Sequence, residues 1–182
     1  MYHKCYDSEI ILALLKAPNH IRSLAKDLDT NPMNVQRKLI DLLERNIVDF
    51  RPDGKNKTFF LKKTAEARMN VYAAEQYKLI HRIHQYPQLR QIIEKIQNDS
   101  RVELAIIFGS YAKAIPKKDS DIDIYIETKN QSIKKELSLI DSKLSIKIGE
   151  YDPDNLLIKE IEKNHIIMKG VEKFYGKNKF FD

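Results

Sequence analysis

The sequence contains a single cysteine, Cys5, among its 182 residues. One thiol excludes an internal disulfide and a cysteine-based zinc site. No apolar run approaches the ~20 residues that a membrane span needs, and the stretch from Met1 to Asp7 lacks the apolar core of a signal peptide. The sequence also has no internal repeats and no low-complexity segments. These absences predict a cytoplasmic protein that does not enter a membrane.

The composition is that of a folded, well-solvated protein with a modest basic excess. Hydrophobic residues make up 42% and charged residues 32%, and the length leaves room for one large or two small domains. The net charge of +6 is uneven, because residues 1–100 hold 17 basic and 12 acidic side chains while residues 101–182 hold 15 and 14. The excess in the N-terminal half suits an anionic partner there, although it would also serve solubility.

The most informative feature is a Gly-Ser pair at the end of an apolar run. Leu104–Phe108 reads as a buried strand, and Gly109 and Ser110 follow it directly. A strand that stops at such a pair presents free backbone N–H groups and a hydroxyl at its tip. This arrangement predicts a small phosphate-binding turn.

Two aspartates follow ten residues after the pair, on a second predicted strand. Alternation along this strand places Asp121 and Asp123 on one face, roughly 6–7 Å apart, and isoleucines on the other. Like charges so close usually require a hard cation such as Mg²⁺. The alternative is an ordinary solvated turn with Gly109 as a strand terminator, but the apolar, β-branched flanks favour a nucleoside triphosphate site.

The motif from Phe108 to Ile124 resembles the signature of the polymerase-β-type nucleotidyltransferases, and the minimal branch of that family most of all. The resemblance covers about residues 100–182. It implies transfer of a nucleoside monophosphate from an NTP, with ATP the expected donor, to an acceptor hydroxyl. It also implies that Mg²⁺ or Mn²⁺ binds the catalytic carboxylates of Asp121 and Asp123. Gly109, Ser110 and the turn amides through Tyr111 would hold the phosphates. Similar minimal members are often antitoxins, so a tyrosine of a toxin partner is the expected acceptor.

One departure from the family concerns a third carboxylate, which active members supply from the next strand. That strand is predicted at Leu144–Ile148, where Ser145 and Lys147 occupy the polar face. Glu150 is the nearest acid, but it has the opposite parity and lies beyond the strand. This leaves three options: Glu150 moves into the site, catalysis uses only two acids, or the domain binds nucleotide without turnover. Separately, Lys147 at this place would suit a triphosphate oxygen. The sequence leaves these options open.

The N-terminal part predicts a winged helix-turn-helix. Helices expected near residues 8–15, 21–28 and 32–45 precede two strands joined by an Asp-Gly turn. From about Ser8 to Lys63 this order resembles winged-helix regulators, which implies double-stranded DNA as a partner. The alternatives are plain solvated faces or a protein-docking module. The residues predicted to contact DNA are Asn34, Arg37 and Lys38 on the third helix and Lys55 and Lys57 at the hairpin tip.

Residues 64–98 predict a long amphipathic linker, interrupted at Pro87, that we expect to form a homodimer seam. His81 and His84 lie one helical turn apart. We interpret them as ordinary helix residues rather than metal ligands, because no third ligand is near.

The sequence therefore predicts an α+β protein with three parts: a winged helix-turn-helix (1–63), linker helices (64–98) and a nucleotidyltransferase-like mixed sheet (99–182). The closing strand is expected at either 166–169 or 172–175. The first functional hypothesis is a Mg²⁺-dependent nucleotidyltransferase that carries a DNA-binding domain. The second is a DNA-binding regulator or antitoxin whose C-terminal domain only binds nucleotide.

Overall fold

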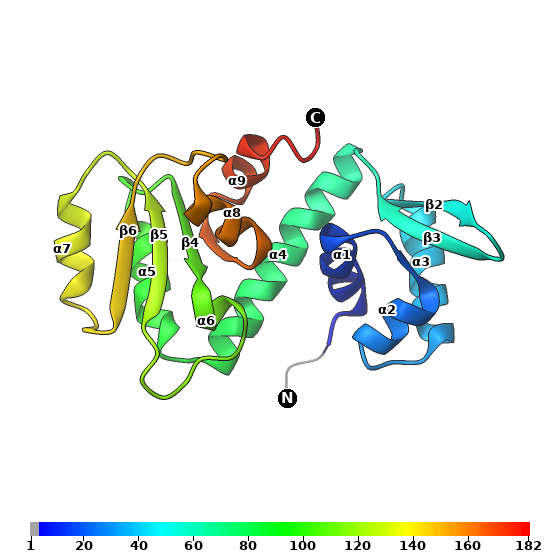
Figure 1. The fold of residues 1–182 in the computed structure, drawn as a ribbon, viewed down its shortest axis with the longest axis horizontal. Helices are drawn as coiled ribbons and strands as arrows, with labels where there is room; N and C mark the ends of the chain where they lie inside the picture. Colours follow the sequence, from blue (N-terminus) through cyan, green and yellow to red (C-terminus); the bar gives the residue numbers. More distant parts are fainter. Residues whose placement is uncertain (1–3) are drawn as a thin grey trace. The chain divides into compact units, whose positions relative to one another are not determined.

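The computed structural model describes residues 4–182, and its helices and strands fall into two units (Figure 1). The first unit runs to Tyr77 and includes the final Phe181–Asp182, and the second is Lys78–Phe180. Residues 1–3, which open the stretch where we predict no signal peptide, lie outside the described residues. The α+β fold class is confirmed. Within residues 4–182, no helix has the length and apolarity that crossing a membrane requires.

The first unit has the predicted order of helices followed by a hairpin. Its elements are α1 (Tyr6–Lys16), β1 (Asn19–His20), α2 (Ile21–Asp27), α3 (Pro32–Glu44), β2 (Val48–Asp53) and β3 (Asn56–Leu61). The strands form one antiparallel sheet in the order β1-β3-β2. The short strand β1, which the sequence analysis did not predict, pairs with β3 and ties the helices to the hairpin.

Helix α3 begins where its sequence provides both an N-cap and a proline. The Asn31 side chain accepts a hydrogen bond from the Asn34 amide at 2.7 Å, and Pro32 occupies the first turn. The buried face of α3 consists of Val35, Leu39 and Leu42. Since this face is fixed by packing, the opposite face of α3 must point to solvent.

The division between the units falls inside α4 (Ala65–Gln85), between Tyr77 and Lys78. Helix α5 (Leu89–Asn98) follows after a short break around Pro87, as predicted. The apolar face of α5 is buried within the second unit, where Leu89, Ile92, Ile93 and Ile96 are at most 2% exposed. Of the two helices in the predicted linker, α4 is therefore the one left to form the expected dimer seam.

The second unit is a four-stranded mixed sheet with helices. Its elements after α5 are β4 (Leu104–Phe108), α6 (Gly109–Ala112), β5 (Ile122–Glu127), α7 (Ser132–Ser138), β6 (Leu144–Ile148), α8 (Leu156–Lys163), β7 (Ile166–Lys169) and α9 (Val171–Lys177). The strand order is β6-β5-β4-β7, with β5 parallel to β6 and β4 antiparallel to both β5 and β7. Of the two sites expected for the closing strand, the structure uses 166–169.

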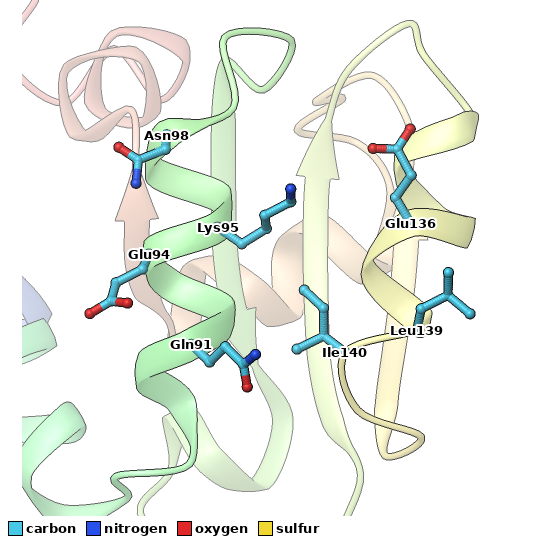
Figure 2. A pocket seen from close by; sticks show the side chains of 7 residues that line it. All are labelled: Gln91, Glu94, Lys95, Asn98, Glu136, Leu139 and Ile140. Atoms are coloured by element: carbon cyan, nitrogen blue, oxygen red, sulfur yellow. The ribbon is translucent and has the colours of Figure 1, made fainter.

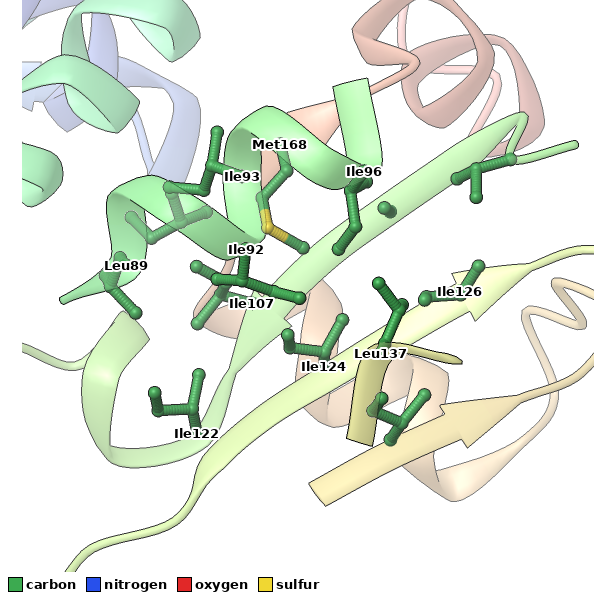
Figure 3. Close-up of a cluster of buried hydrophobic side chains, with 14 of the residues drawn as sticks. Leu89, Ile92, Ile93, Ile96, Ile107, Ile122, Ile124, Ile126, Leu137 and Met168 are labelled. Carbon is green, nitrogen blue, oxygen red and sulfur yellow. The ribbon is translucent and has the colours of Figure 1, made fainter. Parts of the chain in front are cut away.

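The core of this unit lies between one face of the sheet and helices α5 and α7 (Figure 3). Ile122, Ile124 and Ile126 of β5 point into it beside Ile107 of β4. The alternation of β5 consequently turns Asp123 and Tyr125 to the opposite face. On that face Tyr125 packs against Tyr151, with ring centroids 6.2 Å apart. One face of β5 therefore packs in this core, and the other carries the half-buried Asp123 beside the buried Tyr125.

Candidate nucleotide site and candidate DNA-binding face

The predicted phosphate turn and one predicted aspartate meet at the tip of β4. Phe108, the last residue of β4, pairs with Asp123 of β5, and Gly109 follows with a φ of +67°. A Cβ atom at Gly109 would lie 2.4 Å from Oδ2 of Asp123. Glycine is therefore required here twice, for its backbone conformation and for the close approach of a carboxylate. Ser110 comes next and is half-buried.

Asp121 lies just outside β5, and its side chain is exposed. The chain at this point is held in place by the neighbouring strand, because the Ile122 amide donates a hydrogen bond to the Lys143 carbonyl at 2.8 Å. Lys143 also donates from its Nζ to the Lys118 carbonyl at 2.9 Å, which anchors the loop before Asp121. Asp121 is thus separated from Asp123 by one residue, at the point where β5 begins.

The parallel pairing of β5 with β6 identifies the residues beside the aspartates. Ser145 is the register partner of Asp123, and Lys147 is the partner of Tyr125. The position on β6 next to Asp123, where a third carboxylate would have to lie, thus holds a serine. Glu150 is exposed beyond the end of β6, and its charge contributes, after burial and the charge of Glu127, to raising the pKa of Tyr125. Glu150 is therefore close enough to influence the polar face of β5.

The donor set suits a magnesium ion that is shared with a substrate. In residues 4–182 no group of three or more His, Cys, Asp and Glu side chains could hold a metal ion by itself. Mg²⁺ typically binds through one or two carboxylates together with substrate phosphates and water, rather than in an all-protein cage. The carboxylates of Asp121 and Asp123 and the hydroxyl of Ser110 fit that requirement.

Two residues near the turn have roles that the sequence did not reveal. The Tyr111 side chain is 5% exposed and packs edge-on against Tyr86 at 5.2 Å, so only its backbone amide remains for phosphate. Lys113, the residue that follows α6, pairs with Glu160 of α8 at 3.1 Å. No local sequence signal could have found this contact, since the two residues are far apart in the chain.

A groove in the second unit lies away from this turn. It is an open groove of about 540 Å³ between α5 and α7. Lys95 and Gln91 line it from α5 and Ile140 from the α7 side (Figure 2). None of the predicted nucleotide-site residues lines it. The candidate nucleotide site is therefore separate from this groove.

Two of the residues predicted to contact DNA have polar partners within the first unit. Lys38 forms an ion pair with Asp7 of α1 at 2.9 Å, and the Asn34 side chain donates to the Thr30 hydroxyl at 3.1 Å. Both side chains of α3 thus already have a polar partner in the same unit. A role for Lys38 in DNA binding would require it to leave Asp7.

Arg37 is exposed and, in the described part of the chain, makes no ion pair; its guanidinium donates only to the Asn34 side chain at 3.2 Å. The exposed side chain of Met33 flanks it, with 73% of its surface open. At the hairpin tip Lys55 is exposed, and the Lys57 ammonium lies 3.9 Å from the centre of the Phe50 ring. Of the four cations predicted to contact DNA, these three make no ion pair within residues 4–182.

Comparison with known proteins agrees with the geometry of the second unit. Residues 90–175 match the model of the family described as Polymerase beta, Nucleotidyltransferase. This part of the chain, with its mixed sheet, strand-tip turn and facing aspartate, is a nucleotidyltransferase-like domain. The sequence matches none of the curated proteins with which it was compared.

Solved structures resemble the chain only weakly. A mutant of ZitR from Lactococcus lactis is 16% identical, with a TM-score of 0.38, and the match covers 54% of this chain and 70% of that one. A second ZitR mutant is 17% identical, with a TM-score of 0.37, and the match covers 54% of this chain and 65% of that one. Likenesses at this level carry no argument about function.

Proposed function

We propose that the protein is a nucleotidyltransferase that transfers a nucleoside monophosphate from an NTP, with ATP the preferred donor, to an acceptor hydroxyl, and that its winged helix binds double-stranded DNA. The family match of residues 90–175 supports the first part. The acceptor we favour is a tyrosine of a partner protein, as in a toxin–antitoxin pair. We also propose that the protein acts in the cytoplasm as a homodimer joined through α4.

The observation that carries the proposal is the contact between Gly109 and the Asp123 carboxylate. A side chain at position 109 would collide with Oδ2 of Asp123 at 2.4 Å, so the turn and the acid form one feature. The first amides of α6 have no partner within so short a helix. They and the Ser110 hydroxyl are suited to phosphate oxygens, which would then lie beside the carboxylate.

Each residue has a distinct task in this proposal. Asp121 and Asp123 would hold Mg²⁺ or Mn²⁺, and such an ion offsets the charge that develops on the phosphate oxygens. Gly109, Ser110 and the Tyr111 amide would orient the triphosphate for in-line attack at the α-phosphorus. Chemistry of this kind depends mostly on positioning and electrostatics, so few residues are needed.

The residues of β6 favour a second candidate function. Because Ser145 rather than an acid pairs with Asp123, the site has no obvious base for the acceptor hydroxyl. Lys147, exposed on the same face, suits a triphosphate oxygen. A regulator that binds nucleotide through this domain without turnover is therefore the alternative, and Glu150 is the residue that would rescue catalysis.

Labelled ATP distinguishes the two functions. With Mg²⁺ and α-labelled ATP, an enzyme transfers label to an acceptor or to itself and releases pyrophosphate. Asp121→Ala and Asp123→Ala should each abolish transfer, whereas Asp119→Ala, an exposed acid in the same loop, should not. Binding of ATP without label transfer would select the regulator. Transfer that persists in the Asp121→Ala/Asp123→Ala double variant would refute the site.

The DNA-binding part rests on Arg37, Lys55 and Lys57, none of which forms an ion pair within residues 4–182. Their neutralisation of phosphates predicts that log affinity for a duplex falls linearly with log salt, by about 0.9 for each phosphate contacted. Fluorescence anisotropy with an AT-rich duplex at several salt concentrations would measure this slope. If no duplex binds at low salt, the winged helix has another role.

A further inference from the structure

Helix α6 carries the nucleotide turn, yet it is only four residues long. A single turn of helix is not stable by itself, because nucleation costs more than one or two hydrogen bonds return. Its position must therefore be set by neighbouring groups. The contacts to α6 show which groups these are.

Three side chains from the end of α4 and the segment after it support α6 from the side of the core. Tyr86 packs edge-on against Tyr111 at 5.2 Å, and the Gln88 amide donates to the Tyr111 hydroxyl at 3.4 Å. Arg82 donates from its guanidinium to the carbonyl of Ala112, the last residue of α6, at 3.2 Å. All three contacts are made to Tyr111 and Ala112, so it is the C-terminal half of α6 that they attach.

The environment of Arg82 is unusual for a cation. Its guanidinium also donates to the Gln85 side chain at 2.7 Å and lies 5.8 Å from the centre of the Tyr86 ring. In residues 4–182 it has no carboxylate partner, its Nε is buried without a hydrogen bond, and burial lowers its pKa. Burying a cation without a carboxylate partner is costly, and its hydrogen bonds to the Gln85 side chain and to the Ala112 carbonyl offset part of this cost.

A cation at the carbonyl end of a helix also matches the direction of the helix dipole. We propose that Arg82 is a positioning residue: through Ala112 it fixes α6 so that Gly109 and Ser110 are held in the orientation that binds triphosphate. This inference rests on the proposed nucleotide site, although Arg82 itself would not touch the nucleotide.

Hydrogen exchange tests the positioning role without any nucleotide. The amides of Lys113, Ala114 and Ile115 donate to carbonyls of α6 at 3.1, 3.3 and 3.1 Å, so their protection reports whether α6 is formed. Arg82→Met should speed exchange at these three amides and leave the amides of β5 unchanged. Arg90→Met, an exposed arginine on α5, is the matched control and should change neither. Unchanged exchange at 113–115, or an equal rise throughout the unit, would overturn the proposal.

Nucleotide affinity tests the consequence. In Arg82→Met the Kd for Mg·ATP should rise about tenfold, the range that follows when a hydrogen bond from a charged group is lost. Arg82→Lys keeps the charge and should show a smaller rise, which also covers the case that the methionine variant does not fold. An unchanged Kd in both variants would overturn the proposal. If the wild-type protein binds no ATP, the proposed function fails instead, and exchange at 113–115 alone decides whether Arg82 holds α6.

Discussion

The turn at the tip of β4 and the outer face of α3 are the two surfaces for which the sequence predicted a ligand, and they differ in what forms them. At the turn, strand pairing and a glycine bring Asp123 to within contact of position 109. On α3, two of the predicted ligand-binding side chains are occupied by neighbours in the same unit, Lys38 by Asp7 and Asn34 by Thr30.

The difference follows from the physical origin of each surface. Strand register fixes a side chain to within one residue, because a slip would move every apolar residue of β5 out of the core. A long cation on a helix has no such constraint and pairs with whichever acid lies within reach. Backbone-defined sites should therefore be the more sensitive to small substitutions, and surface sites the more tolerant.

The largest effect is expected from Gly109→Ala. The new Cβ would lie 2.4 Å from the Asp123 carboxylate on a backbone with φ +67°, so the turn must move. Displacement of a positioned group by about 1 Å costs about a hundredfold in rate. Label transfer from ATP should fall at least that far, and nucleotide binding should weaken with it.

Gly54→Ala is the matched control for backbone strain. Gly54 has a similar φ of +58°, but a Cβ there would meet no atom within 4 Å. It should cost about 1–2 kcal/mol in unfolding free energy, the penalty for a left-handed residue, and leave label transfer unchanged. If Gly109→Ala behaves like Gly54→Ala in both assays, the turn does not bind the substrate.

The same contrast explains how far the sequence could predict the structure. Strand 144–148 was predicted to the residue, since alternation and flanking turns define it locally. The pairing of Ser145 with Asp123 requires β6 to lie parallel beside β5, which the order of elements suggests. The contact of Arg82 with Ala112 joins residues 30 apart and leaves no periodic trace in the sequence.

Ser145→Asp should have the second-largest effect, and in the direction of gain. Register places this side chain beside Asp123, so the substitution adds a third acid, on the strand next to that of Asp123. If catalysis is limited by the missing carboxylate, label transfer should rise about tenfold or more, within the usual contribution of a positioned acid or base. Single-turnover assays with α-labelled ATP would measure it.

Ser142→Asp controls for the added charge. Ser142 is exposed in the turn before β6, so an aspartate there changes the net charge equally without reaching the strand. Only Ser145→Asp should raise the rate. A rate that falls in Ser145→Asp alone would indicate that two acids suffice and that a third repels the triphosphate.

The smallest effects are expected on α3, where an arginine without an ion pair can be compared with an ion-paired lysine one residue away. Arg37→Met removes an unpaired cation and should weaken duplex binding by about 1–3 kcal/mol, as the loss of a direct DNA contact does. Lys38→Met removes a cation that already neutralises Asp7, so affinity should change by less than about twofold, while the unfolding free energy falls by up to about 1 kcal/mol. Anisotropy titrations and urea denaturation of the same samples would separate the two quantities. Equal losses of affinity in both variants would mean that Lys38 exchanges Asp7 for a DNA phosphate, and that this helix surface adapts to its ligand whereas the turn at Gly109 is fixed in advance.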